Sequence, residues 1–287
     1  MYKQYAKYIV ALLLFGSNGI VASFILLNSV EIVFLRTMIG SVVLIGLFFL
    51  TKQVLTFTQH PKQLLFIFIS GLAMGASWIF LFEAYTQVGV SIASLIYYVG
   101  PVIVLALSPV LFKEKMTVAR LIGFAIVLIG MIFINWSAIA SGTVPTGIWL
   151  GLGAAVMFAT MVIFNKKARN INGLENAMFQ LFFSFIVVAV YLALSEGISI
   201  EFAGVNIWAI LLLGVVNTGL GCYFYFSSIG SLPIQSVSIL GYLEPLSALF
   251  FSFLILSENL SWLQIAGAVF ILGGAAYAEL RGIRNAH

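Results

Sequence analysis

Residues 91–101 read SIASLIYYVGP, and residues 235–245, which lie 144 positions later, read QSVSILGYLEP. Both segments place a tyrosine three residues before a proline, inside a long apolar run. The match extends to both sides of the prolines at the same spacing. The matched pairs are Ser94 with Ser238, Tyr98 with Tyr242, Pro101 with Pro245, Leu105 with Leu249, Ser108 with Ser252, Glu114 with Glu258, Gly123 with Gly267, Leu128 with Leu272, Gly130 with Gly274 and, earlier in each half, Glu31 with Glu175. Because proline, glutamate and glycine positions align together, the chain is predicted to contain an internal repeat.

The composition predicts that most of the chain lies in lipid. Hydrophobic residues make up 62% of the 287 positions and charged residues only 8%, whereas soluble domains have about a quarter charged residues. A membrane helix needs about 20 apolar residues, so this length accommodates about ten spans and no soluble domain. Long apolar runs without alternating polarity favour helices over a barrel, the other structure that satisfies backbone groups in lipid.

The apolar runs define ten predicted membrane helices. Their ranges are 8–27, 31–50, 63–85, 91–111, 118–136, 147–165, 175–194, 206–227, 234–256 and 261–279. The fold class is therefore an all-α integral membrane protein with ten transmembrane helices. Five helices belong to a first repeat, residues 1–137, and five to a second repeat, residues 138–287.

The basic residues give the orientation. With the N-terminus in the cytoplasm and ten crossings, every lysine and arginine except Arg36 falls in a cytoplasmic segment, as the positive-inside rule requires. Both termini are then cytoplasmic. Five spans per half place equivalent loops on opposite sides. The loop at 113–115 is basic and predicted inside, whereas its counterpart at 257–259 has no lysine and is predicted outside. This pattern is typical of inverted-topology repeats, which in transporters surround a substrate site near the middle of the membrane.

Several function classes are disfavoured by what the sequence lacks. It has one cysteine, two histidines and no aspartate, so we expect no internal disulfide, no metal site, no cofactor and no His–Asp catalytic system. An enzyme is therefore not expected. The basic residues are dispersed between apolar segments, which does not suggest nucleic-acid binding. The sequence has no phosphate-binding G-x-x-x-x-G-K-[ST] loop, so ATP is not expected to drive the protein directly.

The two quoted segments, each followed by a glutamate and spaced glycines, resemble the repeat of the EamA family in the drug/metabolite transporter superfamily. Arg36 in the second span and the segment Phe15–Asn18 in the first also resemble that family's pattern. The resemblance covers essentially the whole chain. It implies ten helices, a central cavity between the halves, a bacterial cytoplasmic membrane, and export of amino acids or other small metabolites by a secondary mechanism. Gln180 stands at the Arg36 equivalent and Asn259 follows Glu258, so the halves have diverged.

Glu244 is the leading candidate for a substrate site. It lies near the middle of the ninth span, directly before Pro245, where a charged carboxylate costs roughly 3 kcal/mol or more. It must therefore face a cavity, pair with a cation, or stay protonated. Glu244 is predicted to bind the amino group of a substrate or a coupling proton. The alternative is a neutral acid that is hydrogen-bonded between helices.

Polar and aromatic residues within the spans supply the other substrate-binding candidates, because tyrosine and tryptophan offer both an apolar face and a hydrogen bond. These candidates are Asn18, Trp78, Tyr98, Asn217, Tyr223 and Tyr242. The alternative for each is helix packing or a place in the interfacial aromatic belt.

Two further pairs complete the predicted site. Pro101 and Pro245 each remove a backbone donor and are predicted to kink their helices, either for transport or as static packing features. Arg36 and Glu83 are predicted to form an ion pair or an outer gate. Direct substrate contact and snorkelling to the interface are the alternatives for Arg36.

The combined features predict a secondary transporter that exports a small metabolite by alternating access around a central cavity. The aromatic residues and the single deep carboxylate favour an amino acid or an amine over a highly charged anion. The expected partners are this small-molecule substrate, the lipid bilayer and a coupling proton. The alternative function is a channel or a structural membrane subunit that does not transport.

Overall fold

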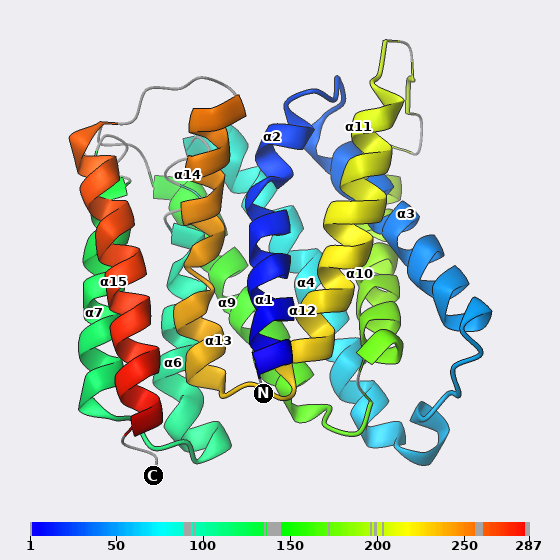
Figure 1. Cartoon of the computed structure of the whole chain (residues 1–287). Coiled ribbons are helices and arrows are strands. Elements are labelled where there is room, and N and C mark those ends of the chain that lie inside the picture. Colours follow the sequence, from blue (N-terminus) through cyan, green and yellow to red (C-terminus); the bar gives the residue numbers. More distant parts are fainter. Residues whose placement is uncertain are drawn as a thin grey trace.

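The computed structural model describes residues 2–88, 93, 96–134, 136, 145–171, 173–195, 197, 200–202, 204–255 and 261–284. This part of the chain is helical throughout its regular structure and contains no β-strand. The helices stand side by side in one bundle, and the start of α1 and the end of α15 lie on the same side of it (Figure 1). We call this side the terminal side. Ser94, the loop at 257–259 and the predicted boundary at residues 137 and 138 lie outside the described residues.

The elements follow the predicted order. The first half contains α1 (Tyr2–Gly16), α2 (Asn18–Ala22), α3 (Ser29–Leu50), the 3-10 helix η1 (Phe57–Gln59), α4 (Pro61–Val88), α6 (Val99–Phe112) and α7 (Val118–Ile134). The second half contains α9 (Pro145–Lys167), α10 (Gly173–Ser195), α11 (Ile207–Leu211), the π-helical segment η2 (Leu212–Leu220), α12 (Gly221–Ile229), α13 (Ile234–Leu240), α14 (Leu243–Ile255) and α15 (Trp262–Arg284).

Apolar helices long enough to cross a membrane make up most of the bundle. Within the described residues, seven helical segments of 21 to 24 residues meet this criterion, and three shorter apolar helices accompany them: Val99–Phe112, Val118–Ile134 and Trp262–Ala278. Each of the ten predicted ranges overlaps one of these segments. Large apolar side chains such as Leu194, which is 83% exposed, point outward, as expected where lipid covers the surface. The chain is therefore a multi-pass integral membrane protein.

Side chains near the helix ends explain several boundaries. Asn28 and Glu31 form a capping box at the start of α3, in which the Asn28 side chain accepts from the Glu31 N–H at 2.9 Å and Glu31 accepts from the Asn28 N–H at 3.0 Å. Asn206 accepts from the Ala209 N–H at 3.2 Å and begins α11. Each contact satisfies an N–H that has no partner within its helix.

The first and the ninth predicted spans differ from the observed helices. The first begins at Tyr2 rather than residue 8, and its helix is interrupted at Ser17 before ending at Ala22. The ninth is interrupted at Gly241 and Tyr242, and α14 begins at Leu243. Because Pro245 has no N–H, the Gly241 carbonyl loses its usual helical donor and accepts from the Glu244 N–H at 3.1 Å instead.

Glycines bring α7 and α15 into backbone contact. A Cβ at Gly123 would lie 2.6 Å from the Gly274 carbonyl oxygen, and a Cβ at Gly130 would lie 2.7 Å from the Gly267 carbonyl oxygen. The reciprocal contacts of Gly267 and Gly274 are equally close, each at 2.6 Å. Gly123 corresponds to Gly267, and Gly130 to Gly274, at the 144-residue spacing. The contacts therefore exchange when the halves are exchanged, and α7 and α15 run antiparallel along one end of the bundle (Figure 1).

The same exchange relates two polar contacts between the halves. Arg36 on α3 donates through Nε to the Thr218 hydroxyl of η2 at 2.9 Å. Gln180 on α10 donates through Nε2 to the Met74 sulfur of α4 at 3.8 Å. Gln180 and Thr218 correspond to Arg36 and Met74, respectively, at the 144-residue spacing. The two-repeat architecture thus fixes which side chains meet, while sequence divergence gives one contact a charge and leaves the other neutral.

Candidate functional site

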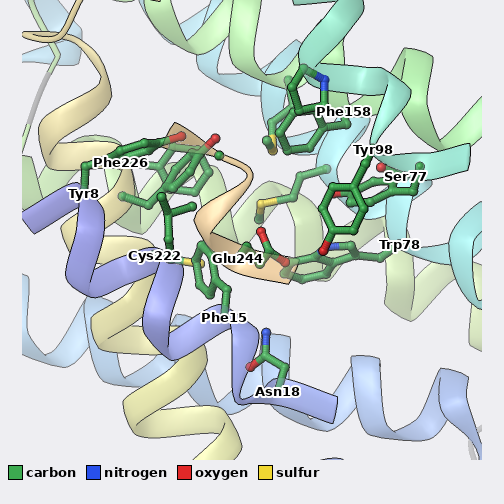
Figure 2. Close-up of a pocket in the computed structure, with 17 residues that line it drawn as sticks. Tyr8, Phe15, Asn18, Ser77, Trp78, Tyr98, Phe158, Cys222, Phe226 and Glu244 are labelled. Carbon is green, nitrogen blue, oxygen red and sulfur yellow. The ribbon is translucent and has the colours of Figure 1, made fainter. Parts of the chain in front are cut away.

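A pocket lies among helices of both halves, next to the interruption of the ninth span. It encloses about 690 Å³ of space, including open solvent at its mouth. The lining residues are mainly aromatic, sulfur-containing and small polar side chains: Tyr8, Leu12, Phe15, Asn18, Met74, Ser77, Trp78, Tyr97, Tyr98, Pro101, Phe158, Met161, Cys222, Tyr225, Phe226, Gly241 and Glu244. Figure 2 shows Glu244 directed into the space between Tyr98 and Trp78 on one side and Phe15 and Cys222 on the other.

The exposure of the lining changes along the helices. On α1, Tyr8 and Leu12 are buried, whereas Phe15, farther from the start of the chain, is partly exposed, as is Asn18 at the start of α2. On α4, Met74 is buried and Trp78, one turn farther along, is partly exposed. Both helices start on the terminal side (Figure 1). The pocket is therefore closed toward the terminal side and more accessible toward the opposite side.

Glu244 is the acidic residue of this pocket. It lies in the first turn of α14, immediately after the interruption, and its side chain is partly exposed to the pocket. Gly16 allows α1 to approach this turn, because a Cβ at Gly16 would lie 2.7 Å from the Glu244 carbonyl oxygen. Among the described residues, no hydrogen bond or ion pair of the Glu244 carboxylate is found, and the charge acting on it is that of Arg36.

Arg36 lies behind the pocket wall. Its side chain is only 6% exposed, and its guanidinium lies 4.8 Å from the centroid of the Trp78 ring, whose side chain lines the pocket. This distance is typical of a cation–π contact. The Nε hydrogen bond to Thr218 holds the guanidinium in place. Arg36 thus adds positive charge close to the pocket without lining it.

The two repeat-related tyrosines have different positions. Tyr98 lines the pocket, whereas Tyr242 is fully buried outside the lining. The Tyr242 hydroxyl donates to the Tyr98 backbone carbonyl at 2.7 Å, and the two ring centroids are 6.2 Å apart. Pro101 lines the pocket, while Pro245 is buried next to Glu244. The structure therefore brings the two repeat-related, proline-containing spans together at one edge of the pocket.

Of three other candidates, one lines the pocket and two lie outside its lining. Asn18 lines it. Asn217 is buried behind α1, where its amide nitrogen lies 3.0 Å from the Leu14 carbonyl oxygen and 3.2 Å from the Asn18 side-chain oxygen. Asn217 thus bonds to the segment where the first span is interrupted. Tyr223 lies outside the lining, with the Lys7 ammonium 5.1 Å from its ring centroid.

Glu83 also lies outside the lining, and its carboxylate accepts from the Gln87 side chain at 3.3 Å. The predicted contact between Glu83 and Arg36 stays a prediction.

Sequence reasoning missed several lining residues, among them Tyr8, Phe158, Cys222 and Phe226. Their spacing carries a weak signal, since Tyr8, Leu12 and Phe15 recur every three or four positions, as one helix face requires. An apolar face toward a pocket and an apolar face toward lipid have the same pattern, so spacing alone does not separate them. Tyr8 was also expected at the first residue of its span.

The comparisons with known proteins agree with this architecture. The family model described as "EamA-like transporter family" matches residues 5–136 and again residues 145–278. The chain belongs to the EamA-like transporter family. This family's two matched segments correspond to the two halves whose contacts exchange in the structure.

Similar proteins include other transporters of this type. A protein of Bacillus subtilis (strain 168), described as an uncharacterized transporter, is 24% identical over 96% of this chain and 89% of its own length. A protein of Salmonella typhimurium named "Probable amino-acid metabolite efflux pump" is 29% identical over 67% of this chain and 68% of its own length. One solved crystal structure has a TM-score of 0.82 at 18% identity, covering 97% of this chain and 98% of that chain. This structural likeness supports the fold.

Proposed function

We propose that this protein is a secondary transporter that exports a small metabolite, an amino acid or an amine, by alternating access. The observation that carries the proposal is the Glu244 carboxylate, which lies in an aromatic-walled pocket between the two repeats without a hydrogen bond or ion pair to the described residues. A carboxylate in such a site is costly unless a ligand cation or a proton neutralises it.

The pocket chemistry favours an ammonium-bearing ligand. Aromatic faces such as Trp78 and Tyr98 pack against apolar groups and attract cations, and Glu244 supplies the opposite charge. Arg36 behind Trp78 adds a positive charge on another side, which suits a ligand that also carries a carboxylate. The name of the Salmonella relative supports the amino-acid class.

The helix directions support alternating access between inverted halves. Equivalent helices run antiparallel in two places: α7 against α15, through Gly123 and Gly274, and α3 against α10, through Phe34 and Phe185 and through Gly40 and Leu181. If equivalent helices run antiparallel in a protein of ten spans, its two five-helix repeats have inverted topology. We assign these repeats to residues 1–137 and 138–287. Such repeats allow the pocket to be exposed to either side in turn. The positive-inside pattern supports a cytoplasmic position for the terminal side, and the family resemblance leads us to expect a bacterial inner membrane.

A single carboxylate is able to couple the transport of a substrate to the movement of protons in the opposite direction. When the ammonium group leaves Glu244, a proton taking its place keeps the site neutral, so binding of the two cations is mutually exclusive. Glu244→Gln removes the charge and retains the size of the side chain.

A binding experiment tests the proposed ligand class. Purified protein is heated in detergent with amino acids, amines or carboxylic acids that lack an amine. Ligands that bind the folded state raise its Tm. We expect members of an ammonium-bearing class to stabilise the wild type and the exposed-site control Glu201→Gln, but not Glu244→Gln. Equal stabilisation of all three proteins would contradict the assignment of Glu244.

A further inference from the structure

Helix α13 lies nearer the terminal side of the bundle than α14, which follows it (Figure 1). All seven of its residues, from Ile234 to Leu240, are buried, and Gly241 directly after it lines the pocket. The Tyr8 hydroxyl, at the buried end of the pocket, donates to the Val237 carbonyl of α13 at 2.8 Å. Helix α13 therefore closes the pocket toward the side on which α1 begins.

The start of α13 is capped by a residue of the other half. Pro233 precedes the helix and supplies no side-chain cap, so the first N–H groups of α13 need another acceptor. The Glu114 carboxylate, from the segment between α6 and α7, accepts from the Ile234 N–H at 2.9 Å and from the Gln235 N–H at 3.4 Å. These contacts join the first repeat to α13.

The Gln235 side chain makes further contacts between the halves. It is fully buried, and its Oε1 accepts from Arg120 Nη1 on α7 at 2.6 Å. Its Nε2 lies 3.4 Å from the Ser108 hydroxyl of α6 and 3.4 Å from the Glu114 backbone carbonyl. Gln235 thus bonds to both helices that flank the segment containing Glu114.

Lys166 of α9 holds the other end of the connection that leads into α13. Its buried ammonium donates to the Ile229 carbonyl at 3.1 Å, to the Gly230 carbonyl at 3.2 Å and to the Leu232 carbonyl. The first of these groups ends α12, where a cation is favourable because carbonyls are exposed. The segment between α12 and α13 is therefore held from both ends.

The internal repeat does not conserve the side chains that hold α13. At the 144-residue spacing, Gln235 corresponds to Ser91, Arg120 to Gln264 and Lys166 to Ala22. Each counterpart is shorter or uncharged. Of the four side chains that hold α13, only Glu114 has an identical counterpart, Glu258.

We propose that α13 is the gate that closes the pocket toward the terminal side, and that Glu114, Arg120, Gln235 and Lys166 are the residues that keep it closed. Breaking the contacts of Gln235 with Glu114 and Arg120, which join the two halves, is the step that opens the pocket to this side. Because the sequence does not repeat these side chains in the other half, the gate residues are particular to this side. The proposal rests on the proposed transport function, because a gate serves a pocket that changes sides.

The single cysteine of the chain makes the gate testable. Cys222 lines the pocket, so its modification by a charged thiosulfonate reagent that does not cross the bilayer reports which side the pocket faces. The rate is measured by mass spectrometry after treating right-side-out or inside-out vesicles. The variants Gln235→Ser and Arg120→Gln introduce the counterpart residues. Glu175→Gln is the matched control, since Glu175 caps the Thr56 and Phe57 N–H groups without contacting α13.

We expect wild type and Glu175→Gln to react slowly from the terminal side. Gln235→Ser and Arg120→Gln should each react about tenfold faster from that side, as expected when a charge-assisted hydrogen bond that favours one state is lost. Reaction from the opposite side should not increase. Cys222→Ala defines the background rate.

If Cys222 were modified from the terminal side at the wild-type rate in both variants, and the proteins were monodisperse, the gate proposal would be wrong. Equal increases from both sides would also overturn it, because they indicate general loosening. If Gln235→Ser does not fold, Arg120→Gln decides. The labelling needs no substrate, so the absence of transport of any solute would contradict the proposed function while leaving the gate result intact.

Discussion

Replacing Gly123 by alanine should destabilise the contact between α7 and α15. The new Cβ would lie 2.6 Å from the Gly274 carbonyl oxygen, 2.7 Å from the Ala278 Cβ and 2.9 Å from the Ala278 backbone nitrogen. Two of these three atoms belong to the backbone, so no side-chain rotation relieves the overlap. The two helices must separate, and overpacking of this kind costs about 1–3 kcal/mol.

Gly273→Ala is the matched control. Gly273 lies beside Gly274 on α15, and a Cβ there would have no atom within 4 Å. Both substitutions gain about the same helix propensity, roughly 1 kcal/mol relative to glycine. The difference between the two variants therefore isolates the cost of the overlap.

Thermal unfolding of the purified proteins in detergent measures this difference. We expect Gly123→Ala to have the lower Tm, by about 2–4 °C for each kcal/mol of overlap. Gly273→Ala should match or exceed the wild-type Tm. If Gly123→Ala were as stable as Gly273→Ala, the backbone contact between the repeat-related helices, and the packing argument built on it, would be refuted.

Three further predictions concern the pocket and its supports. Tyr242→Phe should lower the free energy of unfolding by about 0.5–1.5 kcal/mol, because it removes the bond to the Tyr98 carbonyl; a Tm equal to that of the wild type would contradict this assignment. Asn217→Ala should lower the free energy of unfolding by about 1–3 kcal/mol, since it leaves buried polar groups of the first span unpaired. An unchanged Tm would show that these hydrogen bonds are dispensable. Gly16→Ala should lower transport by displacing α1 from α14, whereas Gly19→Ala, with no atom within 4 Å, should not; equal transport by both would disprove the close-approach argument.

The sequence was informative about the fold because membrane helices have a strong, local signal. Apolar length gave the positions of the helical segments, and the 144-residue spacing identified the equivalent glycines on α7 and α15. The ends were less predictable. The predicted start at residue 8 was late because the polar residues before it, including Lys3 and Lys7, were assigned to a loop although they belong to α1.

The candidate site was partly predictable for a physical reason. Glu244 and Tyr98 are polar groups in apolar spans, so the cost of burying them already indicated a pocket. Asn217 carried the same signal but bonds to an interrupted helix instead. Cys222 and Phe226 gave no such signal, since an apolar side chain is equally stable against lipid, protein or ligand. The polar contacts between the halves could not be predicted, because they depend on which helices pack together. Residue spacing along the sequence does not give that information.

Solute counterflow into proteoliposomes tests the central claim most directly. Vesicles are loaded with an unlabelled amino acid, amine or organic acid, and uptake of the labelled compound is followed for wild type, Glu244→Gln and Glu201→Gln. The account predicts saturable exchange of an ammonium-bearing class, retained by Glu201→Gln and reduced by about tenfold or more in Glu244→Gln, as expected for loss of a bond between charged groups. Equal exchange by all three proteins would contradict the role of Glu244, and non-saturable flux would indicate a channel instead of a transporter.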